Sequence, residues 1–167
     1  MFYECSALTA VDVSGLDTSS VESMESLFRD CAALTTADLS GWNASSVTSV
    51  NAMFNGCTVL TSVNFTGWNT IDLTDMSGMF GGCTGLTSLD LSSFDVSNVV
   101  DMSSLFVGCT GLTSANLAGW NTASVKDLSY MFSNTGSLTA VDASVFHTGN
   151  VTSFDYMFYN SGVQSLD

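Results

Sequence analysis

The stretch MFGGCTGLTSLDLSSFDVSNVVDMSS, residues 79–104, decides the fold, because the same pattern continues on both sides of it without a gap. Its second residue belongs to a column of phenylalanines that recur every 26 positions along the chain. A period held this strictly predicts one supersecondary unit stacked on copies of itself, which is a solenoid. We expect a single domain over residues 1–167, of about six turns, that is a fragment of a longer repeat protein. The column consists of Phe2, Phe28, Phe54, Phe80, Phe106, Phe132 and Phe158.

Each unit contains the spacing LxxLxL, which in the quoted stretch is formed by Leu86, Leu89 and Leu91. In an extended chain alternate side chains share a face, so Leu89 and Leu91 are expected to point inward. We therefore predict one short parallel strand in each unit. The residues expected to point outward from that strand are Ser88, Asp90 and Ser92.

A second element is predicted after the strand. Asn98 has a side chain suited to a helix N-cap, and Gly82 is the type of residue that closes a helix in the preceding turn. Glu4 and Asp30 occupy the glycine position in the first two units, so we expect these units to end differently. We predict about two turns of helix per unit, with a second short strand and an all-β solenoid as the alternative. The apolar stripe that favours the helix is Val99, Met102, Leu105 and Phe106.

The composition excludes several classes of partner. Sixteen acidic residues against Arg29 and Lys126 give a net charge of −14, which repels nucleic acid and anionic lipid. No apolar run approaches the roughly 18 residues of a membrane span. The charge is explained by the solubility of a long repeat surface, with cation binding or a basic partner as alternatives.

The motif MFxxCxxLxxL, as in residues 53–63 and 79–89, together with LxxLxL, resembles the leucine-rich repeats of the BspA-like surface-antigen family. The resemblance covers the entire chain. It implies a right-handed α/β leucine-rich-repeat solenoid, with one strand and one short helix per 26-residue turn and the strands on a concave sheet. It also implies an extracellular or cell-surface protein that acts in adhesion.

The repeated apolar positions are read as structural. Five cysteines form one column, and their number is odd, so we expect reduced, buried packing rather than disulfides. Zinc is not expected, because no CxxC pair occurs. The residues assigned to the core are Cys5, Cys31, Cys57, Cys83, Cys109, Phe28, Phe54, Phe80, Phe106 and Phe132.

Nothing in the sequence specifies a reaction. His147 is the single histidine and has no catalytic motif around it, and neither a phosphate loop nor GxSxG or HExxH occurs. We therefore expect no enzyme, no catalytic residue, no cofactor and no metal, although calcium bridging between turns at Asp90, Ser88 and Ser92 is an alternative.

Two functions remain. The first is an interaction or adhesion module whose concave face contacts a protein or a glycan. The second is a structural segment of a filament or surface layer, which self-associates by end-to-end stacking because both ends expose an apolar cross-section. The predicted binding residues of the concave face are Asp12, Asp38, Asn64, Ser88, Asp90, Ser92, Asn116 and Asp142.

Overall fold

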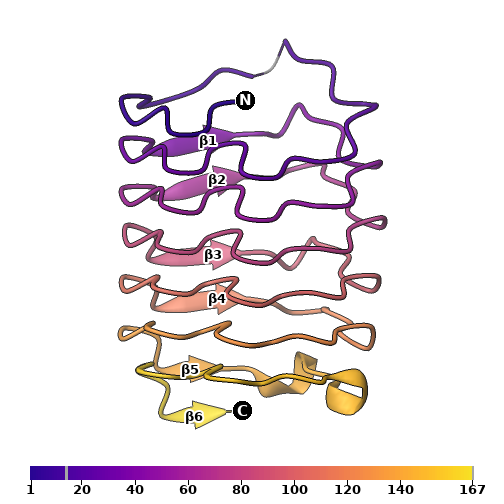
Figure 1. Cartoon of the computed structure of the whole chain (residues 1–167), viewed down its shortest axis with the longest axis vertical. Coiled ribbons are helices and arrows are strands. Elements are labelled where there is room, and N and C mark those ends of the chain that lie inside the picture. Colours follow the sequence, from indigo (N-terminus) through magenta and orange to yellow (C-terminus); the bar gives the residue numbers. More distant parts are fainter. Residues whose placement is uncertain (14, 167) are drawn as a thin grey trace.

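The computed structural model describes residues 1–13 and 15–166, which wind into a column of stacked coils (Figure 1). Each coil takes 26 residues, so coil 1 is 1–26, coil 2 is 27–52, and so on to coil 7, which starts at residue 157. Position numbers below count from the first residue of each coil. The regular elements are β1 (Thr36–Asp38), β2 (Ser62–Asn64), β3 (Ser88–Asp90), β4 (Ser114–Asn116), β5 (Ala140–Val141), the 3-10 turns η1 (Ala143–Val145) and η2 (Thr148–Asn150), and β6 (Ser165–Leu166).

The strands of coils 2 to 6 begin at position 10, within the LxxLxL segment, as predicted. In β3 the middle residue Leu89 is buried, while Ser88 and Asp90 are exposed. β1 pairs in parallel with β2, and β3 pairs in parallel with β4 in the same register. Thr36 lies opposite Ser62, its equivalent one coil later. The predicted parallel strand is therefore confirmed.

The strand side is divided into three two-stranded sheets, β1–β2, β3–β4 and β5–β6. Between β1 and β2 the Leu39 N–H donates to the Asn64 carbonyl at 2.9 Å, and Leu91 makes the same bond between β3 and β4. Phe65 and Leu117 hold the equivalent position, but their N–H groups find no such acceptor among the described residues. We call the boundaries between β2 and β3 and between β4 and β5 the open junctions.

The pairing register changes in the last coil. Ala140 lies opposite Ser165 and Val141 opposite Leu166, an offset of 165 − 140 = 25 residues rather than 26. One residue is therefore missing between the phenylalanine column and the strand in coil 7. The chain still reaches the strand side, and β6 pairs with β5.

The helix predicted after Asn98 is absent, which corrects the expectation of one short helix per turn. The chain from position 23 to position 4 forms a run of tight turns instead. Along the chain the Val107 N–H donates to the Ser104 carbonyl three residues back, at 3.0 Å. The Ser104 and Phe106 N–H groups donate to the next coil, 25 residues on, at 2.8 and 2.9 Å.

Bonds of this second kind cross every junction from coil 1 to coil 7, and we call them the turn-side ladder. Single parallel bridges at position 23 accompany it, as between Asp75 and Asp101. The alternative of a second short strand in place of the helix is closer to the structure, in which single bridges form at this place.

Left-handed residues explain why no helix forms. Position 26 and position 4 both take positive φ, for example 58° at Ser104 and 71° at Gly108. An α-helix of L-residues does not tolerate such a residue in its interior. Glu4 and Asp30 also have φ of 58° and 59°, so the first two units have the same backbone at this position as the later ones.

Asn98 has a different role from the predicted N-cap. Its side-chain Nδ2 donates to the Ile71 carbonyl of the preceding coil at 2.8 Å. Ser124 and Asn150, at the same position of the next two coils, also donate to the coil before them. This polar column therefore joins coils rather than starting helices.

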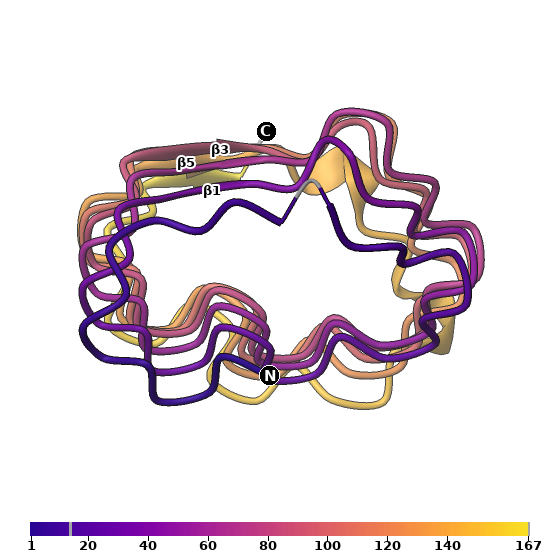
Figure 2. The same cartoon turned by 90° about the horizontal axis from the view of Figure 1, so that it is seen from above.

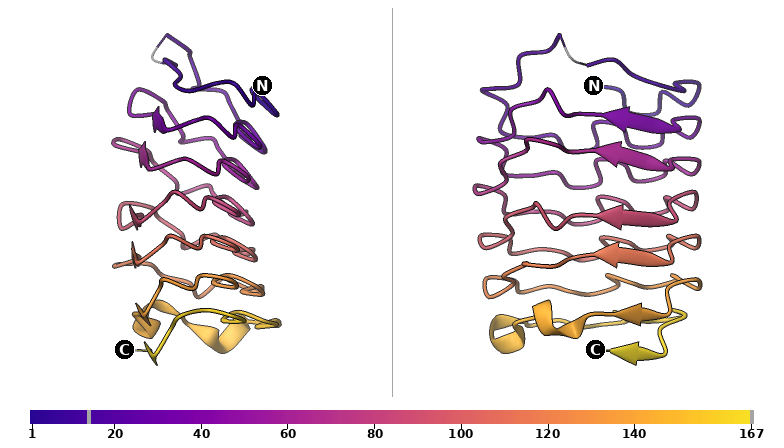
Figure 3. Two further views of the ribbon diagram at one scale, coloured as in Figure 1. Left: turned by 90° about the vertical axis from the view of Figure 1, so that its left-hand side faces the viewer. Right: turned by 180° about the vertical axis from the view of Figure 1, so that it is seen from behind.

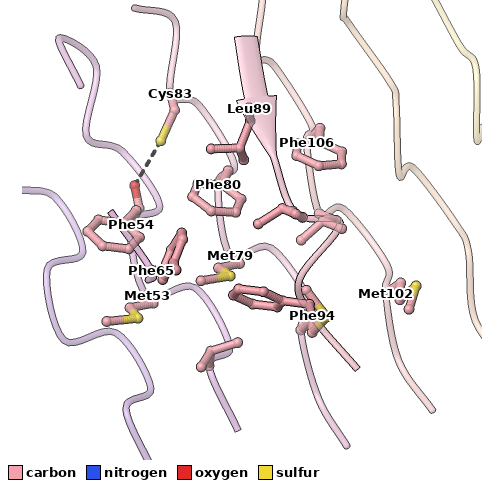
Figure 4. Close-up of a cluster of buried hydrophobic side chains, with 14 of the residues drawn as sticks. Met53, Phe54, Phe65, Met79, Phe80, Cys83, Leu89, Phe94, Met102 and Phe106 are labelled. Atoms are coloured by element: carbon pink, nitrogen blue, oxygen red, sulfur yellow. Dashed lines mark hydrogen bonds between the residues drawn. The ribbon is translucent and has the colours of Figure 1, made fainter. Parts of the chain in front are cut away.

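The core is a continuous stack of apolar side chains inside the column (Figure 4). Consecutive rings of the phenylalanine column lie 5.3 to 6.0 Å apart, and Phe28, Phe54, Phe80, Phe106 and Phe132 are fully buried. The Cys83 thiol donates to the Phe54 carbonyl at 3.1 Å, and Figure 4 shows this bond joining two coils. The repeated apolar letters thus pack along the axis of the column as well as within each coil.

Seen along its axis, the column has two long sides (Figure 2). The strands line one side, which Figure 3 shows edge-on, and the tight turns line the other. A layer of helices would need about 8–10 Å per coil against ~4.8 Å for strands, and such a mismatch bends a solenoid. Here the ring spacing is 5.3 to 6.0 Å, so the strands form one side of a nearly straight column.

Candidate binding face

The side chains predicted to bind a partner all lie on the strand side and are exposed. We call their surface the sheet face. It is formed by position 12 of coils 1 to 6, where Asp and Asn occur, together with the small residues at positions 10 and 14. Ser14 is outside the described residues. The predicted members are Asp12, Asp38, Asn64, Ser88, Asp90, Ser92, Asn116 and Asp142.

Each of these Asp and Asn side chains from coil 2 to coil 6 is held by its own backbone. The Oδ1 atom of Asp90 accepts from the Ser92 N–H at 2.9 Å and from the Ser92 hydroxyl at 2.7 Å. Asp142 makes the same pair of bonds with Ser144. Such Asx turns fix the side chain and end the strand.

These bonds lower the pKa of the carboxyl groups, because the donors favour the charged form. For Asp90 the Ser92 hydroxyl is the main cause, followed by the Ser92 N–H and the amide of Asn116. The pKa of Asp142 is lowered by the Ser144 hydroxyl and N–H. The sheet face therefore carries fixed, ionised carboxylates at neutral pH.

The Asp and Asn residues also follow the pairing of the strands. Asn64 donates through Nδ2 to Asp38 at 3.0 Å, and Asn116 donates to Asp90 at 3.1 Å. Both bonds join strands of one sheet. Among the described residues, no such amide donates across an open junction. At the junction between β2 and β3, position 12 changes from Asn64 to Asp90, whose carboxylate has no N–H to donate to the preceding coil.

The open junctions differ in the corner residues as well. Trp68 and Trp120 donate through Nε1 to the preceding coil at 3.0 and 2.9 Å. Phe94 and Phe146 replace tryptophan at the open junctions and cannot donate. There a threonine bonds across to the next coil, as Thr70 does to the Asp95 carbonyl at 3.0 Å. The tryptophans are nearly fully buried, which leaves no exposed ring for stacking on a sugar.

A shallow hollow of about 410 Å³ crosses the sheet face over β2, β3 and β4. Ser62 and Val63 of β2 line it on one side and residues 114–116 of β4 on the other, with β3 between them. A second hollow of about 400 Å³ continues it toward the strand ends, past Ser92. The sequence pattern did not single out Ser62, although it shares position 10 with Ser88.

Calcium bridging at Asp90 stays a prediction. Oδ1 of Asp90 already accepts three hydrogen bonds, and the Ser92 hydroxyl is one of the donors. Over residues 1–13 and 15–166, no group of three or more His, Cys, Asp and Glu side chains is arranged to hold a metal ion.

The cysteine column lies in the interior and away from this face. Burial is the main cause that raises the pKa of Cys57 and Cys109 to about 12, and it raises that of Cys83 as well. Buried neutral thiols are poor nucleophiles. Cys31 is also buried, and all five are free thiols. Cys5 in the first coil is exposed, which corrects the expectation that the whole column is buried.

His147 lies at an exposed corner of coil 6, where its backbone N–H donates to the Thr122 hydroxyl at 2.7 Å. Among the described residues, no hydrogen bond joins its imidazole to a cysteine or a carboxylate. The parts of the chain that the structure describes contain no helix long and apolar enough to cross a bilayer.

Comparison with known proteins gives a family and a fold. A family model described as "Mycoplasma protein of unknown function, DUF285" matches residues 1–88 and 74–166. A leucine-rich repeat protein from Bacteroides ovatus has a TM-score of 0.57 at 20% identity, over 84% of this chain and 33% of that one. A leucine rich cell surface protein from Faecalibacterium prausnitzii has a TM-score of 0.50 at 17% identity, over 85% and 37%.

These likenesses show a leucine-rich-repeat solenoid, of which the present chain spans about a third of the length of the solved neighbours. The resemblance to BspA-like repeats noted in the sequence is thereby confirmed at the level of fold. No match is found among curated protein sequences.

Proposed function

Because the chain belongs to the DUF285 family and has the leucine-rich-repeat fold, we propose that it is a non-enzymatic interaction module that binds a partner through the sheet face. Stacked repeats present an extended surface in which each coil adds one row of side chains. The observation that carries the proposal is the row of fixed polar side chains that borders the hollow over β2, β3 and β4.

The chemistry of this row suits recognition. Small residues such as Ser62, Ser88 and Ser114 allow the backbone of a partner to approach the strands. The carboxylate of Asp90 and the amide of Asn116 are already oriented by hydrogen bonds, so less side-chain freedom is lost when a partner binds. Protein backbone and sugar hydroxyls both offer the matching donors and acceptors.

We extend this proposal to location. The F. prausnitzii neighbour is described as a cell surface protein. An extracellular or surface location, with adhesion to a protein or a glycan, agrees with a rigid polar face that carries no reactive group. Adhesion is the use of the module that we favour.

Two double variants of equal charge test the role of the face. Ser88→Arg with Ser114→Arg places bulky side chains along the hollow, whereas Ala32→Arg with Ala123→Arg adds the same charge at exposed positions elsewhere. Binding of the labelled chain to arrays of purified surface proteins and of glycans should fall at least about tenfold for the first pair, as hot-spot contacts do. It should stay unchanged for the second. Equal losses would place the binding site off the sheet face.

The second candidate is a structural segment assembled by end-to-end stacking. It is favoured by the contacts between coils, because the turn-side ladder that joins each coil to the next could join one segment to another in the same way. Sedimentation of the chain alone separates this function from adhesion, because adhesion requires no contact between copies.

A further inference from the structure

The sheet face carries charge of one sign. Position 12 is aspartate in coils 1, 2, 4 and 6 and asparagine in coils 3 and 5, and neither lysine nor arginine occurs at position 10, 12 or 14 of any coil. The two cations of the chain lie at other positions, Arg29 at position 3 beside Asp30 and Lys126 at position 22. The sheet face therefore contains carboxylates and no cation of its own.

From coil 2 onward these carboxylates alternate with amides. Asn64 and Asn116 separate Asp38, Asp90 and Asp142, and each amide donates to the carboxylate of the preceding coil. One carboxylate thus occurs in every second coil. Because neighbouring strands of a sheet lie about 4.8 Å apart, the charges are about 10 Å apart along the column.

Asp90 shows that this row can accept a further donor. The residue is exposed, and the three hydrogen bonds that it accepts from Ser92 and Asn116 all reach Oδ1. Among the described residues, Oδ2 of Asp90 accepts none. Asp142 likewise accepts from Ser144 through Oδ1. A cationic donor gains most from such an oxygen, because hydrogen bonds between charged groups are stronger than those between neutral groups.

The surroundings of the row favour a polypeptide over a sugar. Ser62, Ser88 and Ser114 line the hollow over β2, β3 and β4, and these strands lie one above another along the column (Figure 3). A backbone that runs along the column can approach there, because the neighbouring side chains are small. No aromatic residue occurs at position 10, 12 or 14, so a sugar ring would find no aromatic face to stack on.

We propose that the partner is an extended polypeptide segment that runs along the column and carries lysine or arginine at every third residue. This inference rests on the proposed role of the sheet face as the binding surface. Each cation of the segment lies against one carboxylate of the row, at Asp38, Asp90 or Asp142.

The spacing of the carboxylates selects the conformation of the segment. In a polyproline II segment the side chains on one side recur at every third residue, about 9 Å apart. In a β-strand they recur at every second residue, about 7 Å apart. The first spacing matches carboxylates about 10 Å apart, whereas the second brings successive cations between them.

A synthetic peptide tests this inference. The probe is a capped, fluorescently labelled peptide with lysine at every third residue and serine elsewhere, and its binding to the whole chain is measured by fluorescence anisotropy at low salt. A second peptide has the same composition with its lysines adjacent, and a third has glutamate in place of lysine. The net charge of −14 attracts any cationic peptide, so variants of equal net charge are compared.

Two double variants provide that comparison. Asp38→Asn with Asp90→Asn removes two charges from the sheet face and keeps the Asx turns, since the asparagines of coils 3 and 5 form the same turn. Asp17→Asn with Asp95→Asn is the matched control. It removes two charges from position 17, at the corner of the coil, where exposed aspartates form turns of the same kind. Circular dichroism verifies that both variants fold.

We expect the sheet-face pair to raise the Kd of the spaced peptide at least about fivefold, and the control pair to raise it at most about twofold. The peptide with adjacent lysines should bind at least about threefold more weakly, because only one of its cations can lie against a carboxylate at a time. Added salt should weaken binding of the spaced peptide.

Three results would overturn the proposal: no binding of the spaced peptide at low salt, equal losses for the two double variants, or equal binding of the spaced and adjacent or glutamate peptides. The arrays with the Ser88→Arg pair decide separately whether the sheet face binds a partner at all. A glycan or an uncharged protein captured there through the sheet face would support the interaction module and overturn the basic segment.

Discussion

At the scale of single residues, the left-handed backbone at position 4 shows how one geometry is met by different side chains. Gly82 takes φ of 71° without steric cost, and Asn134 takes 58° with the modest cost typical of asparagine. Glu4 and Asp30 take the same conformation although their type rarely does. Because the neighbouring coils hold this turn from outside, the local preference of the residue does not decide it.

Gly82→Ala should lower the free energy of unfolding by about 1–2 kcal/mol, the cost of a left-handed non-glycine residue. The added Cβ would lie 3.7 Å from the Gly56 backbone, which is ordinary contact, so the loss comes from φ alone. Gly136→Ala is the control, because its φ is not left-handed and no atom lies within 4 Å of the new Cβ. Chemical denaturation compares the two. Equal losses would contradict the conformational explanation.

The carboxyl groups of the sheet face predict how stability depends on pH. The pKa of Asp90 is lowered by Ser92 and Asn116, so it lies below the unfolded value of about 3.9. A lowered folded pKa adds stability above the unfolded pKa, and that stability is lost as pH falls through the folded pKa. We expect unfolding midpoints to decrease on acidification below about pH 4.

Asp90→Asn should make this decrease shallower and leave the neutral-pH structure intact, since Asn64 and Asn116 form the same turn elsewhere. Titration of the Asp90 carboxyl carbon by NMR gives the pKa directly. A value at or above about 3.9 would show that the Asx turn does not form in solution.

At the scale of elements, the strands and the tight turns contribute differently to the column. The turn-side ladder crosses all junctions, whereas the strand ladder is interrupted between β2 and β3 and between β4 and β5. Asparagine amides and tryptophan indoles join the coils where strands pair. Threonine at position 18 joins them at the open junctions.

Hydrogen exchange should report this difference at matched positions. The Leu39 and Leu91 N–H groups are bonded to the next coil, and those of Phe65 and Leu117 are not. We expect slower exchange at the first two, because exchange of a bonded amide requires local opening. The Phe106 amide of the turn-side ladder serves as the internal reference for a protected site. Equal protection at all four strand positions would mean that the sheet is continuous.

The sequence predicted the strands because Leu89 and Leu91 alternate with polar residues in a period that only an extended chain has. The stripe of Val99, Met102 and Leu105 led to the wrong prediction of a helix, because apolar residues three apart also face inward in a run of tight turns. One local signal against the helix was Gly78, which occupies the same position as Ser104 one coil earlier and takes a φ of 61°. The open junctions depend on packing between coils, which no single repeat contains.

Part of the candidate site was likewise readable. Position 12 was correctly placed on an exposed face, because its neighbours Leu89 and Leu91 had to be inside. The alternation of Asp38, Asn64, Asp90 and Asn116 is visible in the letters, but its meaning appears only when amide and carboxylate are found bonded within one sheet. The hollow lies over β2, β3 and β4 and had no sequence signal.

At the scale of the whole molecule, charge is unbalanced. The net charge is −14, and the one ion pair among the described residues joins Arg29 and Asp30 at 3.4 Å on the surface. Exposed pairs of this kind stabilise little. Repulsion among carboxylates therefore outweighs attraction and opposes the compact state.

Raising NaCl from about 0.02 M to about 0.5 M should raise the Tm, because salt screens the repulsion. Calcium chloride at matched ionic strength should add no more than sodium does, since Oδ1 of Asp90 is already occupied by hydrogen bonds. Thermal melts with and without a chelator measure both effects. A calcium-specific increase that the chelator reverses would assign a cation site to the sheet face.

The hydrogen-bond ladders differ between the two sides of the column, so we expect the turn side to resist stretching more than the strand side. Bending the column so that the strand side is convex stretches that side, where hydrogen bonds between strands are already missing at the two open junctions. Bending the column so that the turn side is convex must break hydrogen bonds of the turn-side ladder at every junction. We therefore expect the molecule to bend more easily with the strand side convex, and a partner that bends it in this direction should separate β2 from β3.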